Sequence, residues 1–279
     1  MAYKTLLSVL SDPALMETPL AQGDALAMAE DAHFDVLCLG VDRTQTGYYY
    51  AGANAMLLQE SISRAQEDAA ALEKAVKQRL EGTQARWATD TGVAQLADLG
   101  RIVAARARFS DLVILPRPYG EGCGAELEPI IESAMFEGHA PVLVMPDAAA
   151  MAARPKKIMI SWNESVEAMN AIRAAMPFLQ KADLVSVVVV DPPAHSPNRS
   201  DPGGPLSQWL SRHGVRVEID VLSKTLPRVS DVILRHATDM DAELVVMGAY
   251  GHSRFREAIL GGATRNMLEH ASVPVFMAH

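Results

Sequence analysis

Hydrophobic positions along the chain follow two alternating patterns: short apolar runs and longer amphipathic stretches. The short runs are rich in valine, leucine and isoleucine, which is typical of strands buried on both faces. Ten strands are predicted on this basis, at Lys4–Leu10, Phe34–Asp42, Ala85–Thr89, Ser110–Leu115, Pro141–Met145, Lys157–Asn163, Leu184–Pro192, Val215–Ile219, Ala242–Met247 and Pro274–Ala278. Helical spacing of apolar residues predicts helices between them, among others at Met56–Leu80, Glu164–Met176 and Arg228–Thr238. Asp12, followed by Pro13, is predicted to be an N-cap.

The ten predicted strands fall into two series of five, which match in the same order. The clearest match is between Ser110–Leu115 and Ala242–Met247, and the first strands align when Lys4 is placed on Lys157. Each half therefore predicts an α/β fold, a doubly wound (Rossmann-like) five-stranded parallel sheet with helices on both faces. The Ala/Pro-rich stretch Asp147–Pro155 separates the tandem domains, predicted at 1–148 and 155–279. The last strands of the two halves are expected to pair with each other, which would cover their edges.

The two halves differ between their second and third strands. The first half carries an insertion there with Tyr48, Tyr49 and Tyr50, which pack either at an interface or on their own domain. The second half has a shorter link, rich in proline and glycine, which leads into a short helix predicted at Leu206–Arg212.

Composition narrows the class of protein. The net charge of −9 disfavours nucleic acid and anionic membranes as partners. No apolar run is long enough to span a bilayer, and the N-terminus lacks the pattern of a signal peptide, so a cytoplasmic protein is expected. Two cysteines are too few for a disulfide framework or a zinc site. Cys38 is expected to be a buried small hydrophobe, and Cys123, in a Gly-rich loop, either a reactive or an inert thiol.

The richest candidate chemistry lies near the C-terminus. Gly248 and Gly251 directly follow a predicted strand, and Gly261 and Gly262 precede a helix predicted at Thr264–His270. Glycines let a backbone approach a ligand closely, and a helix N-terminus offers free amides and a positive dipole end. The loop is therefore a candidate phosphate site, to which Thr264 could add its hydroxyl; an ordinary flexible loop with a helix N-cap is the alternative.

This loop resembles that of the universal stress protein family, whose ATP-binding members carry G-x2-G-x9-G-[S/T] after the fourth strand. Gly248, Gly251 and Gly261 match the spacing, and the resemblance extends over both halves in strand order. It implies that ATP, with or without magnesium, binds the second half as a cofactor. The implied ligand positions are Ser161, Trp162, Asn163, Val189, Met247, Gly248, Tyr250, Gly251, Gly261, Gly262, Ala263 and Thr264. His252 and Ser253 are interpreted as a further phosphate-contacting pair.

Two positions depart from the family pattern. Gly262 stands where a serine or threonine is usual, and Asn163 stands where ATP binders commonly have an aspartate. Trp162 either stacks on a base or caps the core. In the first half Pro116 replaces the first glycine, and Glu126 and Glu128 lie where a phosphate would favour positive potential. Leu10 aligns with Asn163, so the first half is predicted to be a degenerate copy.

No catalytic constellation is found in the sequence: there is no P-loop, nucleophile elbow or zinc-peptidase motif. We therefore expect no enzyme, but a stress-response protein that binds an adenine nucleotide in its C-terminal domain. A homodimer is left open, and neither nucleic acid nor a membrane is expected as a partner. The alternatives are a scaffold that binds partners without nucleotide, and a slow nucleotide hydrolase or transferase.

Overall fold

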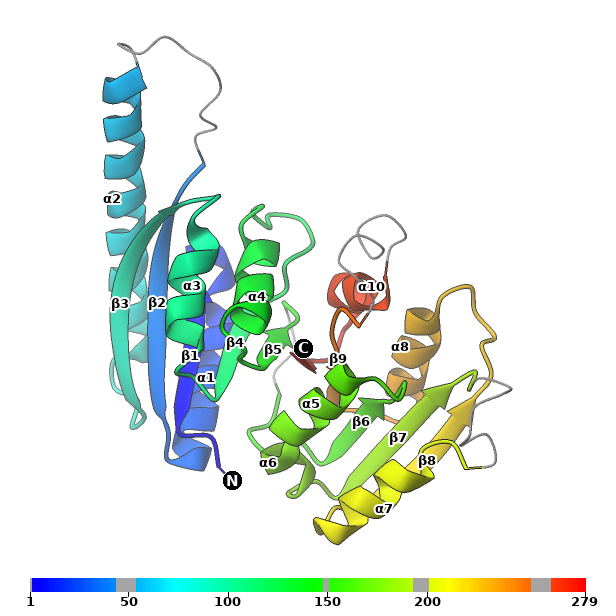
Figure 1. Cartoon of the computed structure of the whole chain (residues 1–279). Coiled ribbons are helices and arrows are strands. Elements are labelled where there is room, and N and C mark those ends of the chain that lie inside the picture. The colour runs from blue at the N-terminus through cyan, green and yellow to red at the C-terminus, as the bar shows by residue number, and fades with distance from the viewer. Residues whose placement is uncertain (1, 44–53, 148–150, 193–200, 252–261) are drawn as a thin grey trace. The chain divides into compact units, whose positions relative to one another are not determined.

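The structure, a computed structural model of the chain, describes all residues except 1, 44–53, 148–150, 193–200 and 252–261 (Figure 1). The chain divides into two compact units. The first unit comprises Tyr3–Ala140, and the second comprises Pro141–His279 with the first two residues of the chain. The three tyrosines of the insertion lie outside the described residues. In the part of the chain that is described, no helix has the length and apolar character needed to cross a membrane.

The first unit is a parallel sheet with strand order β3-β2-β1-β4. Its elements are β1 (Thr5–Leu10), a 3-10 turn (Pro13–Leu15), α1 (Glu17–Glu30), β2 (His33–Asp42), α2 (Asn54–Leu80), β3 (Arg86–Gln95), α3 (Leu99–Ala107), β4 (Leu112–Pro116) and α4 (Leu127–Phe136). Asp12 caps the 3-10 turn by accepting from the Ala14 amide at 2.8 Å, so the predicted N-cap is confirmed.

The second unit has the strand order β5-β10-β9-β6-β7-β8. Its elements are β5 (Val142–Met145), β6 (Lys157–Ser161), α5 (Val166–Ala174), α6 (Met176–Leu179), β7 (Leu184–Val190), α7 (Gly204–Arg212), β8 (Val217–Leu222), α8 (Val229–Asp239), β9 (Leu244–Gly248), α10 (Ala263–His270) and β10 (Val275–Ala278). Every strand pair is parallel except β5 with β10.

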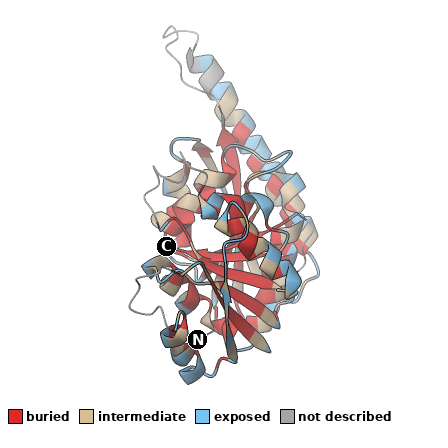
Figure 2. Cartoon of the chain, turned by 90° about the vertical axis from the view of Figure 1, so that its right-hand side faces the viewer, coloured by how far each residue is buried: buried red, intermediate tan, exposed pale blue. Residues whose placement is uncertain are grey.

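The predicted α/β class is confirmed in both units, and the described strands follow one another along the chain as predicted. The helix predicted at Glu164–Met176 is interrupted at Ala175, where α5 gives way to α6, which has a proline in its first turn. The strand predicted at Ala85–Thr89 continues to Gln95, because β3 pairs with β2 along its whole length. Bulky apolar side chains fill the core between sheet and helices, and Figure 2 shows the strands largely in the colour of buried residues.

The expected pairing of the two last strands is confirmed, with Phe276 opposite Leu143 in an antiparallel register. Because of this pairing, β5 groups with the second unit, although the sequence assigns it to the first domain. The domain limits 1–148 and 155–279 stay predictions.

The two cysteines lie in different environments. Cys38 is fully buried in β2, and burial raises the pKa of its thiol to about 12, with smaller contributions from nearby charges. The thiol is therefore unreactive at neutral pH, as its position in an apolar run indicates. Cys123 is half-buried, and its thiol donates to the Arg117 carbonyl at 3.6 Å.

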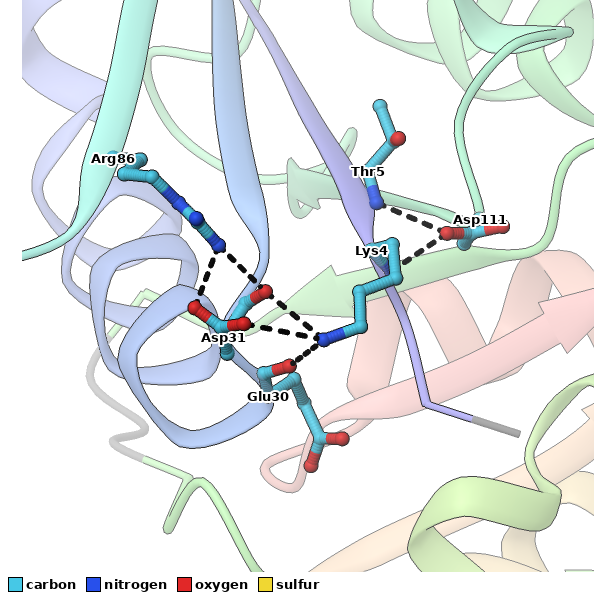
Figure 3. Close-up of polar contacts among 6 residues, drawn as sticks. All are labelled: Lys4, Thr5, Glu30, Asp31, Arg86 and Asp111. Carbon is cyan, nitrogen blue, oxygen red and sulfur yellow. Dashed lines mark hydrogen bonds and ion pairs between the residues drawn. The ribbon is translucent and has the colours of Figure 1, made fainter.

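Charged side chains close the amino ends of the strands in the first unit (Figure 3). The Lys4 ammonium donates to the carbonyls of Glu30 and Asp31 at 2.8 and 3.1 Å, and Arg86 donates to the Asp31 carboxylate at 2.6 Å. These cations neutralise the negative end of α1. The Asp111 carboxylate accepts from the Lys4 amide at 2.7 Å, which ties β4 to β1.

The second unit repeats this carboxylate contact one position off the sequence alignment. The Lys156 amide donates to Glu243 at 3.0 Å, as the Lys4 amide does to Asp111. Sheet register agrees, since Leu6 lies opposite Leu112 and Ile158 lies opposite Leu244. Lys4 thus corresponds to Lys156, and the alignment of Lys4 with Lys157 was wrong. Two adjacent lysines at the start of β6 allow both alignments, and the correct one places Ser11, not Leu10, at the position of Asn163.

Candidate functional site

The predicted ligand positions of the second unit gather where β6 and β9 end. The two strands are neighbours, with Ser161 opposite Met247. From β6 the chain moves to β7 on one side, whereas β9 lies on the other, so this is the point where strand order reverses and α/β sheets bind ligands. Trp162, half-buried, donates its amide to the Val188 carbonyl at 2.9 Å, which brings the buried Val189 to the same edge.

Gly248, at the end of β9, packs directly on the first turn of α5. A Cβ atom at this position would lie 2.4 Å from the Ala168 amide nitrogen and 2.7 Å from the Glu167 carbonyl carbon. Since real Cβ atoms do not approach backbone so closely, only glycine fits here. The first glycine of the motif therefore has a packing role, whether or not it also contacts a ligand.

A hydrogen bond to a side chain joins the two ends of the glycine loop, the segment from Gly248 to Gly262. Thr264 is buried in the first turn of α10, and its hydroxyl oxygen accepts from the Tyr250 amide at 3.2 Å. Tyr250 is itself buried and adopts a left-handed backbone angle of φ 57°, a conformation that non-glycine residues rarely adopt. Thr264 thus fixes the loop, and this bond is the role that the structure describes for its oxygen.

The first turn of α10 has features that suit an anion. Its N-cap residue, Gly262, supplies no side-chain cap, and exposed Ala263 follows it. The first amides of a helix have no intrahelical partner and carry its positive dipole end. Asn266 steadies this turn by donating its side-chain amide to the Gly262 carbonyl at 3.1 Å, and Arg228 donates to Asn266 at 2.9 Å.

The ends of β6 and β9 and the first turns of α5 and α10 form the ligand corner of the second unit. Two charged residues outside the predicted ligand positions lie at this corner. Arg228, just before α8, brings a guanidinium to the first turn of α10. Glu167 lies in the first turn of α5, with a carboxylate oxygen 3.3 Å from where a Cβ of Gly251 would be. Both contacts join segments far apart in the sequence, so no linear pattern could have found them. The corner therefore has a cation on the α10 side and an anion on the α5 side.

The remaining predicted positions are placed as follows. Asn163 is exposed and accepts from the Ser165 amide at 3.2 Å, which starts the turn into α5. Gly251 is exposed at the beginning of the loop. His252, Ser253 and Gly261 lie outside the described residues. Across the residues that are described, no group of three histidine, cysteine, aspartate or glutamate side chains could hold a metal ion.

The same corner of the first unit contains an ion pair. Glu126, at the N-cap of α4, is 1% exposed, and its carboxylate accepts from Ser11 at 3.0 Å and from the Arg43 guanidinium Nε at 3.3 Å. Arg43 Nη2 makes a second, shorter bond to it. Burial alone raises the pKa of Glu126, but the bonds and charge of Arg43, with the Ser11 hydroxyl, bring that pKa below its usual value.

The chain is similar to known proteins in a family model, in the sequence of a relative and in solved structures. Residues 155–279 match the model of the universal stress protein family. A universal stress protein of Synechocystis is 27% identical over 153 residues, which cover 54% of this chain and 50% of that protein; the match thus spans about half the length of the relative.

Solved structures share the fold over nearly the whole chain. A universal stress protein from Archaeoglobus fulgidus aligns with 98% of this chain and 95% of its own, at a TM-score of 0.72 and 15% identity. A functionally unknown protein from Pseudomonas aeruginosa aligns with 99% of this chain and 92% of its own, at a TM-score of 0.61 and 16% identity. At these identities the likeness shows the fold alone.

Proposed function

We propose that the second unit, which matches the model of the universal stress protein family over residues 155–279, binds one adenine nucleotide, ATP, without turning it over. The observation that carries this proposal is the first turn of α10. It opens on a glycine with no side-chain cap, beside the end of β9 and with Arg228 linked to it through Asn266.

The phosphates and the adenosine of ATP are assigned to two different places in the second unit. The phosphates lie against the amides that follow Gly262, where the helix dipole and the Arg228 guanidinium favour negative charge. The adenosine lies over the ends of β6 and β7, where Trp162 offers a ring and Val189 an apolar surface. ATP with or without magnesium fits this assignment, and no side chain is assigned to the metal.

A binding role without catalysis follows from the groups at this corner. Hydrolysis needs a positioned base or a residue that orients water. Asn163 is neutral and already accepts from the Ser165 amide, and Glu167 lies in the first turn of α5, away from the amides of α10. The site therefore supports recognition of a nucleotide.

A scaffold that binds no nucleotide is the second candidate, and two observations favour it. Glu167 brings negative charge beside Gly251, and Gly262 lacks the hydroxyl that the family pattern has at that position. In this case the second unit would act through its surface alone.

Mass spectrometry of nucleotide released from the purified chain separates the two candidates, followed by calorimetric titration with ATP, ADP, GTP and cyclic AMP. The proposal predicts an adenine nucleotide in the released fraction or saturable binding of one in the titration. A chain that releases none and gives a silent titration with all four ligands would establish the scaffold. Release of inorganic phosphate from ATP above the rate in buffer would instead contradict the non-catalytic role.

A further inference from the structure

The Glu126 carboxylate is almost completely buried, and its hydrogen-bond partners lie directly after two strands. Ser11 follows β1, Arg43 follows β2, and Glu126 itself stands at the start of α4. Gly124 completes the enclosure, because a Cβ there would lie 2.4 Å from both carboxylate oxygens. A hydroxyl, a guanidinium and a glycine backbone thus surround one anionic group.

These surroundings coincide with the candidate ligand corner of the second unit. Ser11 corresponds to Asn163 by sheet register, and the N-cap of α4 corresponds to Gly262, the N-cap of α10. In both units the corner lies between the end of the first strand and the start of the last helix. The second unit presents uncapped amides there, whereas the first unit presents a carboxylate together with its cation.

We propose that Glu126 is an internal anion that occupies the ligand corner of the first unit, where it takes the place of an external phosphate group. The partners of its carboxylate are those that an oxyanion uses: a guanidinium with two N–H donors and a serine hydroxyl. The first unit is therefore self-liganded and stays closed to nucleotide. With the carboxylate removed, the corner becomes a binding site for a small oxyanion. The inference rests on the proposed function only in taking this corner as the place of an anionic ligand.

The test is a gain of phosphate binding in the intact chain with Glu126→Ala. Both this variant and its parent carry Gly251→Val, which weakens the proposed site of the second unit equally in the two chains, so that a difference between them comes from the first unit. Melting temperatures are recorded with 0–50 mM inorganic phosphate, at constant ionic strength kept with chloride. We expect phosphate to raise the melting temperature of the Glu126→Ala chain by several degrees and to leave that of its parent nearly unchanged.

Arg43 supplies the control. The added substitution Arg43→Ala should abolish the phosphate effect, because the guanidinium holds the anion. An equal effect of phosphate on the Glu126→Ala chain and its parent would overturn the proposal, as would an effect that persists without Arg43. If Glu126→Ala does not fold in plain buffer, the same test is refolding: recovery of folded chain with phosphate supports the internal anion, and no recovery with phosphate or sulfate refutes it.

Phosphate alone is the probe, so this outcome is independent of the nucleotide titration. Wild-type chain that binds ATP while Glu126→Ala gains no phosphate site would leave the proposed function standing and remove the internal anion. The reverse pair of results would remove nucleotide binding in the second unit and keep the internal anion in the first.

Discussion

The two units of this chain share a scaffold and differ at one corner. Strands run in the order β3-β2-β1-β4 in the first unit and β8-β7-β6-β9 in the second, and a carboxylate ties the fourth strand to the first in both. At the carboxyl ends the first unit has an ion pair between the buried Glu126 carboxylate and the partly exposed Arg43, whereas the second has a glycine loop and an uncapped helix. The same strand pattern thus gives the same fold in both units. A few residues at the carboxyl ends of the strands differ, and they set whether the corner holds an ion pair or free helix amides.

The largest expected effect comes from removing the cation of each corner. Arg43→Ala leaves the Glu126 carboxylate buried without a cation, which costs about 3 kcal/mol of unfolding free energy, the lower end of the range because Arg43 is 56% exposed. Arg228→Ala removes a bond to neutral Asn266 and should cost about 1 kcal/mol. Urea denaturation of the intact chain measures both. Equal losses would mean that the two corners do not differ in kind.

Nucleotide binding should respond to a substitution in one loop only. Gly251→Val places a side chain beside Glu167 at the loop, and loss of one charge-assisted hydrogen bond of about 1.5–3 kcal/mol weakens ATP binding roughly 10- to 100-fold. The melting temperature should change little, since a Cβ there meets only the end of a flexible side chain. Gly122→Val, in the loop of the first unit, should leave the dissociation constant unchanged. Equal losses from the two variants would misplace the site.

The packing role of Gly248 can be separated from ligand contact. Gly248→Ala forces a Cβ into the backbone of α5, and such overpacking costs about 1–3 kcal/mol of stability even without nucleotide. Gly92, in β3 of the first unit, is the matched control, because its Cβ would have ordinary contacts at 3.4 Å and beyond. Chemical denaturation of the two nucleotide-free variants checks this. If Gly248→Ala is as stable as Gly92→Ala, the close approach of β9 to α5 is not what requires glycine.

The smallest effect is a difference in acid stability. Burial raises the pKa of Glu126, but the bonds and charge of Arg43 outweigh it and hold that pKa below the usual 4.5. The ion pair therefore stabilises the first unit above that pH, and the stabilisation is lost as pH falls through the folded-state pKa. Glu126→Gln should therefore be less stable than wild type at pH 7, and the gap should shrink below pH 4.5. Melting temperatures at pH 7, 5, 4 and 3.5 measure it. Parallel curves for the two chains would contradict the ion pair.

Much of the fold could be predicted from the sequence because buried parallel strands are written as continuous apolar runs. The positions and chain order of the ten described strands follow from those runs. The pairing of the two last strands was instead expected from the family resemblance, and its antiparallel register, with Phe276 opposite Leu143, was not predicted. The alignment of β1 with β6 could not be predicted, since Lys4 can be matched to either Lys156 or Lys157. The grouping of β5 with the second unit depends on tertiary contacts that no local pattern records.

The candidate site was predictable only in its backbone. Glycine spacing and a helix start point to the loop, but the charges that complete the corner come from distant segments. Arg43 reaches Glu126 across 83 residues, and Arg228 reaches Asn266 across 38. Thr264 was expected to meet a phosphate, whereas the structure places its oxygen on the Tyr250 amide. The assignment of ligand contacts, including those of His252, Ser253 and Gly261, stays a prediction.

The stoichiometry of adenine-nucleotide binding tests the central difference between the units most directly. Calorimetric titration of the intact wild-type chain with ATP should give one site per chain, and Gly251→Val should weaken binding at that site roughly 10- to 100-fold. One site is expected because, in the second unit, the first amides of α10 have no side-chain cap and Arg228 is exposed beside them. In the first unit the Glu126 carboxylate occupies the corresponding corner. Two equivalent sites per chain, or one site that is unchanged by Gly251→Val and disappears with Arg43→Ala, would contradict the account.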